Sequence, residues 1–510
     1  MVLLAMALGV VVIANDFTAL NVALPAIEQD FDVDVGTVQW VINAYCLTFG
    51  MALVTGGRLA DLFGRRRVFF IGTAMFAGFS LLGGLAPNTG WLIVMRVGMG
   101  IGGALMWPAI LGMTYAALPP ARAALAGGLI LGAAGLGNAV GPLIGGVLTD
   151  ELSWRWIFFL NVPIAAFAVA VTALKVHQPP VEAEAERIDY AGIATLSAGL
   201  LLLLLAFDQA GDWGFGDPRV IAMLAVAIAL VVAFGFVEPR MRENALVPVD
   251  VISNREFRYA CLAILLFSAG FFATVLYVPQ FMEKVLGYSA LEAGVGMLPM
   301  LGTFALTSFA AGPIYERLGP KLTITLGAAC MVAGPFLLSL ISADSAYGAL
   351  VPGLAVTGVG VGLYAPSLTT ASVNALGQAR ASLAGGLIYM FQIGGGALGL
   401  GITTAIFTIT SEDELASEAS AAGFDLTEHQ TSVAHGDLAG TDAAAAALGN
   451  LSSSAAERVE AAVRDSFVVG IQWGFRYVAA VALIGFVVAA LFVGGRAGEA
   501  REEAPESAPA

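Results

Sequence analysis

Two ionisable residues lie inside long apolar segments of this sequence. Asp16 falls within the first apolar run, and Arg96 is the one basic residue of 23 that lies inside such a run. An arginine within a membrane span is retained when it is paired or faces a polar cavity, so we expect Asp16 to be its partner. A carboxyl group beside a guanidinium can bind and release a proton as its surroundings change. The pair is therefore a candidate for proton coupling.

Asp16 belongs to a polar patch. On a helical wheel Asn15, Thr18 and Asn21 lie within about 120°, and Asp16 lies about 100° from Asn15 on the far side. Asp16 can therefore face Arg96 while the other three residues line a cavity. The further candidates for a substrate cavity are Trp107, Phe271, Phe272, Tyr277, Tyr389, Phe391 and Gln392. For each aromatic residue alone, helix packing or lipid contact is the competing interpretation.

A charged loop follows the second apolar run and reads Gly57-Arg58-Leu59-Ala60-Asp61-Leu62-Phe63-Gly64-Arg65-Arg66-Arg67. The glycines at its ends permit tight turns. An acid and several arginines this close can form a switchable salt-bridge cluster, although anchoring at the cytoplasmic face is the simpler interpretation. The candidates for a conformational switch are Gly57, Arg58, Asp61, Gly64, Arg65 and Arg66.

The apolar run 123–148 carries glycines at helical spacing. Gly137, Gly141 and Gly145 are four residues apart on one face, which lets a neighbouring helix approach closely. Pro142 removes a backbone hydrogen bond and is expected to bend the helix. The motif is completed by Gly128 and Gly146. A general seam of small residues is the alternative interpretation.

The composition of the chain indicates that these residues lie in a membrane protein. The chain has 510 residues, 58% of them hydrophobic and 12% charged, whereas a soluble chain carries roughly 25% charged residues. Apolar runs of spanning length recur without the alternation of a β-barrel. We predict an all-α membrane protein with fourteen spans, over 2–24, 37–56, 67–86, 91–117, 123–148, 155–175, 189–207, 219–238, 257–282, 291–314, 321–341, 347–372, 381–410 and 469–494.

The chain contains an internal repeat. Residues 121–130 match 379–388 at nine of ten positions, and Pro108 meets Pro366 at the same offset of 258. Duplicated helical halves are typical of secondary transporters, whose substrate site lies at the interface of the halves. The repeat predicts a six-helix bundle over 1–176, two inserted helices with linkers over 177–256, a second six-helix bundle over 257–496 and a tail over 497–510.

Basic residues predict the orientation. With the N-terminus inside, sixteen Lys and Arg residues lie in the inside loops and tail against six in the outside loops. We therefore expect a multi-pass protein of the inner (cytoplasmic) cell membrane with both termini cytoplasmic. The acidic loop 411–465 is then outside, with helical segments at 412–422 and 455–466. It is interpreted as a solvated flap, with a gating role as the alternative.

These motifs resemble those of the major facilitator superfamily. The loop 57–67 is similar to its signature, with a degenerate copy at 312–321. The stretch 15–25 and the run 154–163 resemble the branch of 14-helix drug–proton antiporters. The resemblance covers residues 1 to about 495. It implies that Asp61 and Arg65 help to latch the cytoplasmic side, and that the glycine spacing of 123–148 is the antiporter motif of exporters.

The combined expectation is a proton-coupled exporter of drugs or antibiotics that works by alternating access. Its partners would be a lipophilic small molecule, protons and the bilayer, and it would act as a monomer. A proton-coupled uptake symporter and a metabolite exporter on the same fold are the alternatives. The dispersed cysteines and histidines show no ligand spacing, so we expect no metal, no cofactor and no enzymatic activity. No nucleic-acid partner is expected.

Overall fold

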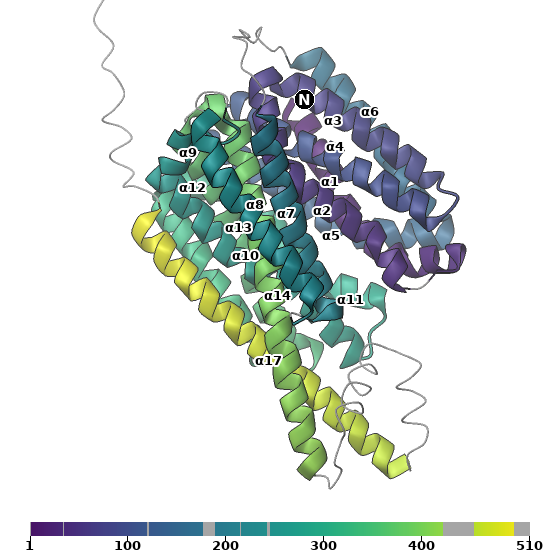
Figure 1. Cartoon of the computed structure of the whole chain (residues 1–510). Helices are drawn as coiled ribbons and strands as arrows, with labels where there is room; N and C mark the ends of the chain where they lie inside the picture. The colour runs from purple at the N-terminus through teal and green to yellow at the C-terminus, as the bar shows by residue number, and fades with distance from the viewer. Residues whose placement is uncertain are drawn as a thin grey trace, which may run out of the picture.

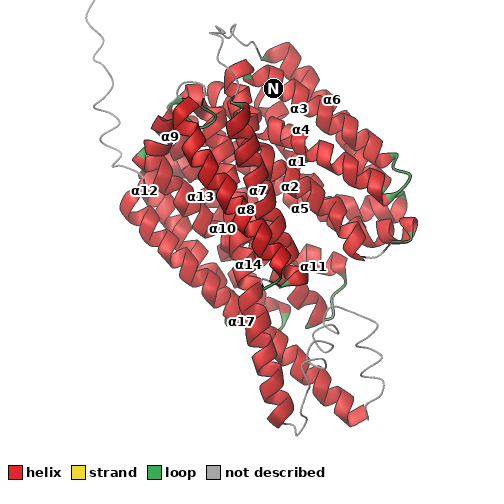
Figure 2. Ribbon diagram, viewed as in Figure 1, coloured by secondary structure: helices red, strands yellow, loops and turns green. Residues whose placement is uncertain are grey.

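The computed structural model describes residues 2–33, 35–119, 122–176, 189–214, 216–241, 245–421 and 453–493. Helices make up nearly all of these segments, and none of them contains a β-strand (Figure 2). This result confirms the predicted all-α membrane fold. Most of the acidic loop 411–465, the linker 177–188 and the tail 497–510 lie outside the described residues.

Six helices of the first part of the chain pack against one another. They are α1 (Val2–Phe31), α2 (Val35–Phe63), α3 (Arg65–Gly84), α4 (Thr89–Ala116), α5 (Ala123–Glu151) and α6 (Arg155–Lys175). Local signals set several of their ends. Gly64, with φ of 95°, makes the turn between α2 and α3, a conformation that favours glycine. Asn88 caps α4, because its side chain accepts a hydrogen bond from the backbone N–H of Trp91.

The second part of the chain forms another set of packed helices. They are α10 (Arg255–Lys284), α11 (Ala290–Gly296), α12 (Leu298–Leu338), α13 (Tyr347–Leu376), the short 3₁₀ helix η3 (Gln378–Arg380), α14 (Ala381–Ala421) and α17 (Ser453–Phe492). The predicted helical segments of the acidic loop are continuations of membrane helices, because α14 runs on to Ala421 and α17 begins at Ser453. Both helices extend beyond the rest of the molecule at the lower end of Figure 1.

The predicted spans 291–314 and 321–341 join in one element, α12. Gly319 lies inside it with φ of 80° and ψ of 165°, which is not a helical conformation, so α12 consists of two helices joined directly at a kink. Among the described residues, thirteen helices are long and apolar enough to cross a membrane. Dividing α12 at Gly319 yields the predicted fourteen. The separation of the two spans is therefore a sharp kink rather than a loop.

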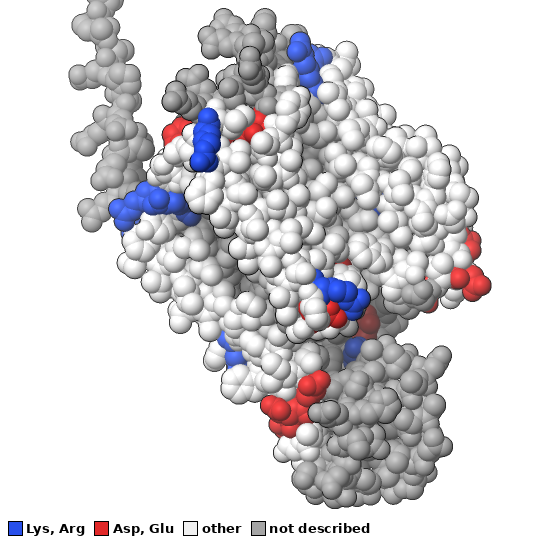
Figure 3. Space-filling view, viewed as in Figure 1, with Lys and Arg blue, Asp and Glu red and all other residues white. Residues whose placement is uncertain are grey.

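Two further long helices lie between these sets. α7 (Tyr190–Trp213) and α8 (Pro218–Met241) pack side by side, and α7 contacts both α2 and α14. They cross the front of the molecule in Figure 1, between the purple helices and the green and yellow ones. The short helix α9 (Val249–Ser253) then leads into α10. On the face seen in Figure 3, charged side chains lie mostly toward the helix ends, with an uncharged belt between them.

The two sets of helices meet along a long interface. α5 packs against α12 and α13, while α2 and α4 pack against α14. The helices that carry the candidate motifs, α2, α4 and α5, therefore all reach this interface. α1, which carries Asp16, packs against α5 and α6 behind it.

Candidate proton-coupling and substrate site

Asp16 of α1 and Arg96 of α4 form an ion pair inside the first set of helices. Nη1 of Arg96 donates to Oδ2 of Asp16, and neither side chain is exposed. A buried charge is tolerated when it is paired and hydrogen-bonded. The pairing expected from the sequence is therefore present in the structure.

Arg96 is held by more than its counterion. Its Nε donates to the backbone carbonyl of Val41 in α2 over 2.7 Å. Its Cζ lies 4.2 Å from the centroid of the Tyr45 ring, also on α2, in a cation–π contact. Nη2 of Arg96 has no hydrogen-bond partner in the described part of the chain. The guanidinium therefore keeps two contacts with α2 that do not depend on the charge of Asp16.

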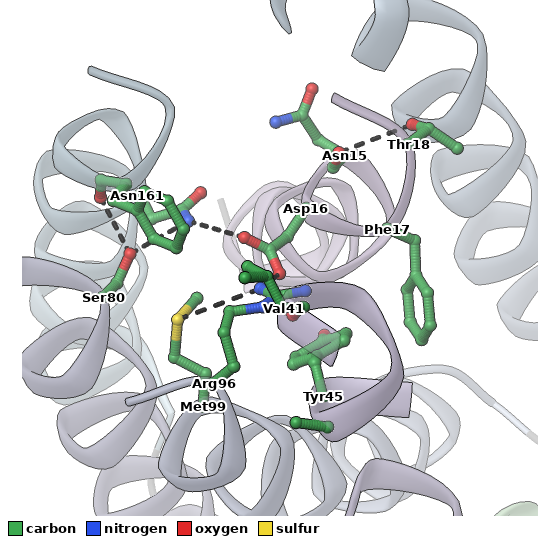
Figure 4. A network of polar contacts seen from close by, with 12 residues as sticks. Asn15, Asp16, Phe17, Thr18, Val41, Tyr45, Ser80, Arg96, Met99 and Asn161 are labelled. Atoms are coloured by element: carbon green, nitrogen blue, oxygen red, sulfur yellow. Dashed lines mark hydrogen bonds and ion pairs between the residues drawn. The ribbon is translucent and has the colours of Figure 1, made fainter. Parts of the chain in front are cut away.

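The sequence reading missed the residues on the other side of the carboxylate. Nδ2 of Asn161 on α6 donates to Oδ1 of Asp16 over 3.2 Å and also lies 3.1 Å from Oγ of Ser80 on α3. Oγ of Ser80 in turn donates to the carbonyl of Phe158 over 2.8 Å. Figure 4 shows Asp16 between Arg96 and Asn161. The feature of the sequence that could have predicted this contact is Asn161 itself, a polar amide within the run 154–163.

The remaining residues of the polar patch lie on another side of α1. Figure 4 shows Asn15 and Thr18 pointing away from the ion pair. Oδ1 of Asn15 is buried without a partner in the described part of the chain. Thr18 lies against Gly141 of α5. Asn21 is exposed and donates to the carbonyl of Phe17 over 3.0 Å.

The glycines of α5 serve two different neighbours. Gly137 and Gly141 lie against α1, because a Cβ on Gly137 would be 2.9 Å from the backbone O of Val11 and one on Gly141 would meet Thr18. Gly145 continues this face against the backbone of Ala19. Gly128 faces α12 instead, where a Cβ would be 2.6 Å from the carbonyl O of Ser308. α5 is therefore packed tightly between the helix that carries Asp16 and the second half.

Gly146 and Pro142 lie outside these tight contacts. A Cβ on Gly146 would meet Leu291 at 3.5 Å, which is ordinary van der Waals contact. Pro142 lies inside α5, and its Cβ would be 3.4 Å from a Cβ on Gly294 of α11. Pro142 therefore faces α11, whereas Gly146 makes only ordinary contacts, with Leu291 and with Val22 of α1 at 3.8 Å.

The charged turn between α2 and α3 bonds to the second half. Both Nε and Nη2 of Arg65 donate to Oδ1 of Asp61, over 3.2 and 3.1 Å. Nη2 of Arg65 also donates to the carbonyl of Gln378, over 2.5 Å. The other oxygen of Asp61, Oδ2, accepts a hydrogen bond of 2.9 Å from the backbone N–H of Leu383 in the first turn of α14. A carboxylate at a helix N-terminus is favoured by the helix dipole.

Close backbone approach accompanies these bonds. A Cβ on Gly57 would be 2.7 Å from the carbonyl O of Ser382, so α2 and α14 touch here because the glycine has no side chain. Arg66 turns to α6, where Nη2 donates to the carbonyl of Ala173 over 2.9 Å. On the α4 side, Oη of Tyr115 lies 3.0 Å from Oγ1 of Thr370. This end of the interface is therefore closed by contacts between the halves.

A row of aromatic rings connects the ion pair to the second half. We call the five residues Phe17, Tyr45, Phe49, Tyr389 and Trp107 the aromatic row. Ring centroids are 4.8 Å apart from Phe17 to Tyr45, 5.9 Å from Tyr45 to Phe49 and 5.9 Å from Phe49 to Tyr389. The ring of Tyr389 on α14 lies 4.3 Å from that of Trp107 on α4. Trp107 and Tyr389 were expected in the cavity, whereas the other three rings were not singled out.

The other cavity candidates lie within the second half. Phe271 contacts Phe272 at 5.5 Å between ring centroids. Oη of Tyr277 donates to Thr404 on α14 over 2.8 Å, so its hydroxyl bonds to its own half. Gln392 is buried on α14 and Phe391 is half-buried beside it. No group of three or more metal-ligating side chains occurs among the described residues.

Comparisons with known proteins agree with this architecture. The family model of the Major Facilitator Superfamily matches residues 6–400. The chain is 31% identical to the tetracenomycin C resistance and export protein of Streptomyces glaucescens over 507 residues, which cover 99% of this chain and 93% of that protein. It is 34% identical to the cephamycin export protein CmcT of Amycolatopsis lactamdurans, covering 79% of this chain and 84% of that one.

Another relative and a solved structure extend the comparison. The chain is 31% identical to the multidrug transporter protein MdtP of Bacillus subtilis, covering 78% of this chain and 73% of that protein. The crystal structure of the human organic anion transporter MFSD10 superposes with a TM-score of 0.64 at 13% identity. That superposition covers 96% of this chain and 98% of the human one, and it shows the shared fold.

Proposed function

This chain belongs to the major facilitator superfamily, and we propose that it exports lipophilic small molecules of the drug and antibiotic class in exchange for protons. The observation that carries proton exchange is the fully buried ion pair of Asp16 and Arg96. Charges inside a membrane are expensive and mark ion and proton pathways. The class of substrate is supported by the relatives, which are named for the resistance to and export of antibiotics.

Asp16 is the proton carrier in this mechanism. In its charged form it neutralises Arg96 and accepts the hydrogen bond from Asn161. When Asp16 binds a proton, Arg96 keeps the carbonyl of Val41 and the ring of Tyr45 but loses its counterion. The two states differ by one charge in a site without water contact, where electrostatic interactions are strong. Substrate or a movement of the halves then decides which state is favoured.

We call the contacts of Gly137, Gly141 and Gly145 of α5 with α1 the glycine seam. This seam passes the change at Asp16 to the second half. Asp16 lies on α1 between the residues that touch Gly137 and Gly141 of α5. The same α5 touches α12 through Gly128, so a shift of α1 is transmitted across a helix packed tightly on both sides. The aromatic row offers a second route, since Arg96 lies over Tyr45 and Tyr389 belongs to α14. Alternating access by rocking of the halves follows.

The substrate would meet the aromatic row at the interface of the halves. Aromatic rings offer stacking surfaces to a planar lipophilic compound. Nε1 of Trp107, Oη of Tyr45 and Oδ1 of Asn15 are buried polar atoms with no partner in the described part of the chain. Buried polar groups are normally hydrogen-bonded, so these atoms are available to the polar groups of a substrate. A lipophilic compound that carries hydroxyl or carbonyl groups fits both features.

The contacts that close one end of the interface support an outward-facing conformation of the carrier. The α2–α3 turn is tied to η3 and α14 through Arg65 and Asp61, which closes that end of the interface. We assign this end to the cytoplasm from the excess of basic residues in its loops. The protein would then lie in the cell membrane of a bacterium, with both termini on the cytoplasmic side. Breaking the bonds of Asp61 and Arg65 would open the carrier inward.

Transport in proteoliposomes tests the proposal. The purified protein is reconstituted with an imposed pH gradient, and movement of tetracenomycin C and of ethidium is followed. Exchange of substrate against protons predicts that substrate accumulates in the more acidic compartment. Accumulation in the more alkaline compartment would instead identify a proton symporter. Movement that does not respond to the gradient would contradict proton coupling.

A further inference from the structure

A second pair of buried acids lies away from Asp16, on the two inserted helices. Asp189 is the residue before α7, and Glu238 lies in the last turn of α8. Their exposed fractions are 3% and 1%. The mechanism proposed above makes no use of either residue. Acids at this depth call for a physical account, because an isolated carboxylate is costly to bury.

In each carboxyl group one oxygen accepts a hydrogen bond, and the other, called here the orphaned oxygen, has no donor in the described part of the chain. Oδ1 of Asp189 accepts from the backbone N–H of Gly192 over 2.7 Å, and Oε1 of Glu238 accepts from the backbone N–H of Val247. Oδ2 of Asp189 and Oε2 of Glu238 have no donor in the described part of the chain. The described part of the chain therefore contains two buried acceptor atoms that receive no hydrogen bond.

The two orphaned oxygens face each other across Gly192. A Cβ on Gly192 would be 3.0 Å from Oε2 of Glu238 and would also meet Oδ2 of Asp189. Because both oxygens lie within 3.0 Å of this one point, the two carboxyl groups are direct neighbours. A hydrogen bond between two carboxyl groups requires that one of them carries a proton.

The described surroundings of the pair hold little compensating charge. Arg58 of α2 is the cation that acts on Glu238. The other acid near this end of α2, Asp61, is bound to Arg65 and Leu383. α14, which also packs on α7, has no ionisable Asp, Glu, Lys, Arg or His between Ala381 and Ser411. The segment 245–248 contributes apolar side chains and the N–H of Val247. Arg240 is exposed and bonds to its own helix.

We propose that Asp189 and Glu238 bind one proton between them, forming a proton site on the inserted helices that is separate from Asp16. One proton satisfies both orphaned oxygens and leaves a single negative charge facing Arg58. Two adjacent carboxyl groups in a shared site hold their first proton strongly and titrate as a pair. The site therefore responds to pH at the end of the molecule that carries the charged turn.

The proton site is linked to that turn through the connection between α8 and α10. Glu238 holds Val247, and three residues later Asp250 forms an ion pair with Arg380 of η3. The hydrogen bond from Arg380 lowers the pKa of Asp250 below its ordinary value, so this link stays charged. Arg65 bonds to the carbonyls of the neighbouring residues Gln378 and Ala379. Loss of the shared proton would loosen the anchor of a segment that holds η3 against the closed end.

Infrared spectroscopy during a pH titration tests the shared proton directly. The full-length protein in nanodiscs should lose a carboxylic-acid C=O stretching band as the pH rises, and this band should be missing in D189N and in E238Q. D16N and D217N serve as controls and should retain it; Asp217 is a half-buried acid at the opposite end of the α7–α8 pair, already paired with Arg219. A titration without such a band, or a band unchanged in both D189N and E238Q, would overturn the proposal.

Thermal melting gives a second and independent readout. A proton shared as proposed would exist only in the folded protein, so the stability it contributes would be present at low pH and lost as the pH rises. E238Q places an amide N–H where the proton lies, so its melting temperature should equal that of the unmodified protein at low pH and exceed it at high pH. Glu238→Ala should be destabilised at both. Equal losses in the Gln and Ala variants would count against a shared proton.

Discussion

Asn161 on α6 donates a hydrogen bond of 3.2 Å to Oδ1 of Asp16, which lies 145 residues earlier on α1. The other carboxylate oxygen receives the guanidinium of Arg96 on α4. The carboxylate is therefore held from two sides by helices that are distant in sequence. Under the proposed function, a proton on Asp16 would remove the ion pair with Arg96 and weaken the charge-assisted hydrogen bond from Asn161, so the amide would influence the pH at which the carrier works.

Replacing Asn161 with leucine should move the pH profile of transport to higher pH. The amide stabilises the charged form of Asp16, and a hydrogen bond to a charged group contributes about 1.5–3 kcal/mol. The measurement is the initial rate of gradient-driven transport in proteoliposomes over a pH series. Ser80→Ala is the control and should shift the profile less, because Ser80 touches Asn161 and not Asp16. A profile that stays in place in Asn161→Leu would contradict this role.

Asp16→Asn should abolish pH-driven accumulation while downhill exchange of substrate persists. Asparagine is close in size and cannot carry the proton, but it leaves Arg96 without a counterion, and an unpaired buried charge costs several kcal/mol. Expression and melting temperature must therefore be measured beside transport. Asp217→Asn, at an acid paired with Arg219 in the α7–α8 connection, is the matched control and should transport normally. Full accumulation in Asp16→Asn would exclude Asp16 as the proton carrier.

Gly141→Leu should abolish transport without preventing membrane insertion. The glycine lies directly against Thr18, so a large side chain would force α5 away from α1. Gly146→Ala is the control, since its Cβ would make only ordinary contact with Leu291. Efflux of ethidium from cells that lack other pumps measures activity, and a surface-labelling assay measures insertion. Normal efflux by Gly141→Leu would remove the glycine seam from the mechanism.

Asp61→Ala should release the first turn of α14. The backbone N–H of Leu383 would lose its acceptor, and Arg65 would lose one of its partners. Hydrogen–deuterium exchange over residues 381–386 should become faster by roughly tenfold or more, given about 1.4 kcal/mol per factor of ten and a charge-assisted bond of at least that size. Arg67→Gln, an exposed position of the same turn, is the control. Unchanged exchange would show that this end is closed by other contacts.

The orientation in the membrane can be measured by cysteine labelling of intact cells. In a chain without its native cysteines, Ser432→Cys in the acidic loop should react with a membrane-impermeant maleimide. Ser507→Cys in the C-terminal tail should react only after permeabilisation. The reason is the excess of basic residues on the side of the tail. The reverse pattern would invert the topology and the assignment of the closed end.

The sequence by itself determined the helices and the main chemical pair. The length of each apolar run sets a membrane helix, because backbone groups in lipid must be satisfied within the segment. The cost of an unpaired charge was enough to join Asp16 to Arg96, with no knowledge of the packing. Local pattern also located the break between the spans 291–314 and 321–341, where α12 leaves the helical conformation at Gly319. Gly319, with φ of 80°, and Pro320 after it are the local signals for this break.

Only the tertiary structure decided which faces meet. Helical spacing showed that Gly137 and Gly141 share a face of α5, but it could not say that this face meets α1 while Gly128 meets α12. The positions of Asn161 beside Asp16, and of the orphaned oxygens of Asp189 and Glu238 beside each other, likewise depend on helices that are far apart in the chain. A periodic pattern specifies a side of one helix and carries no information about its neighbour. That neighbour is selected when all the helices pack together, because only then do shape and hydrogen bonding across the interfaces contribute to the free energy.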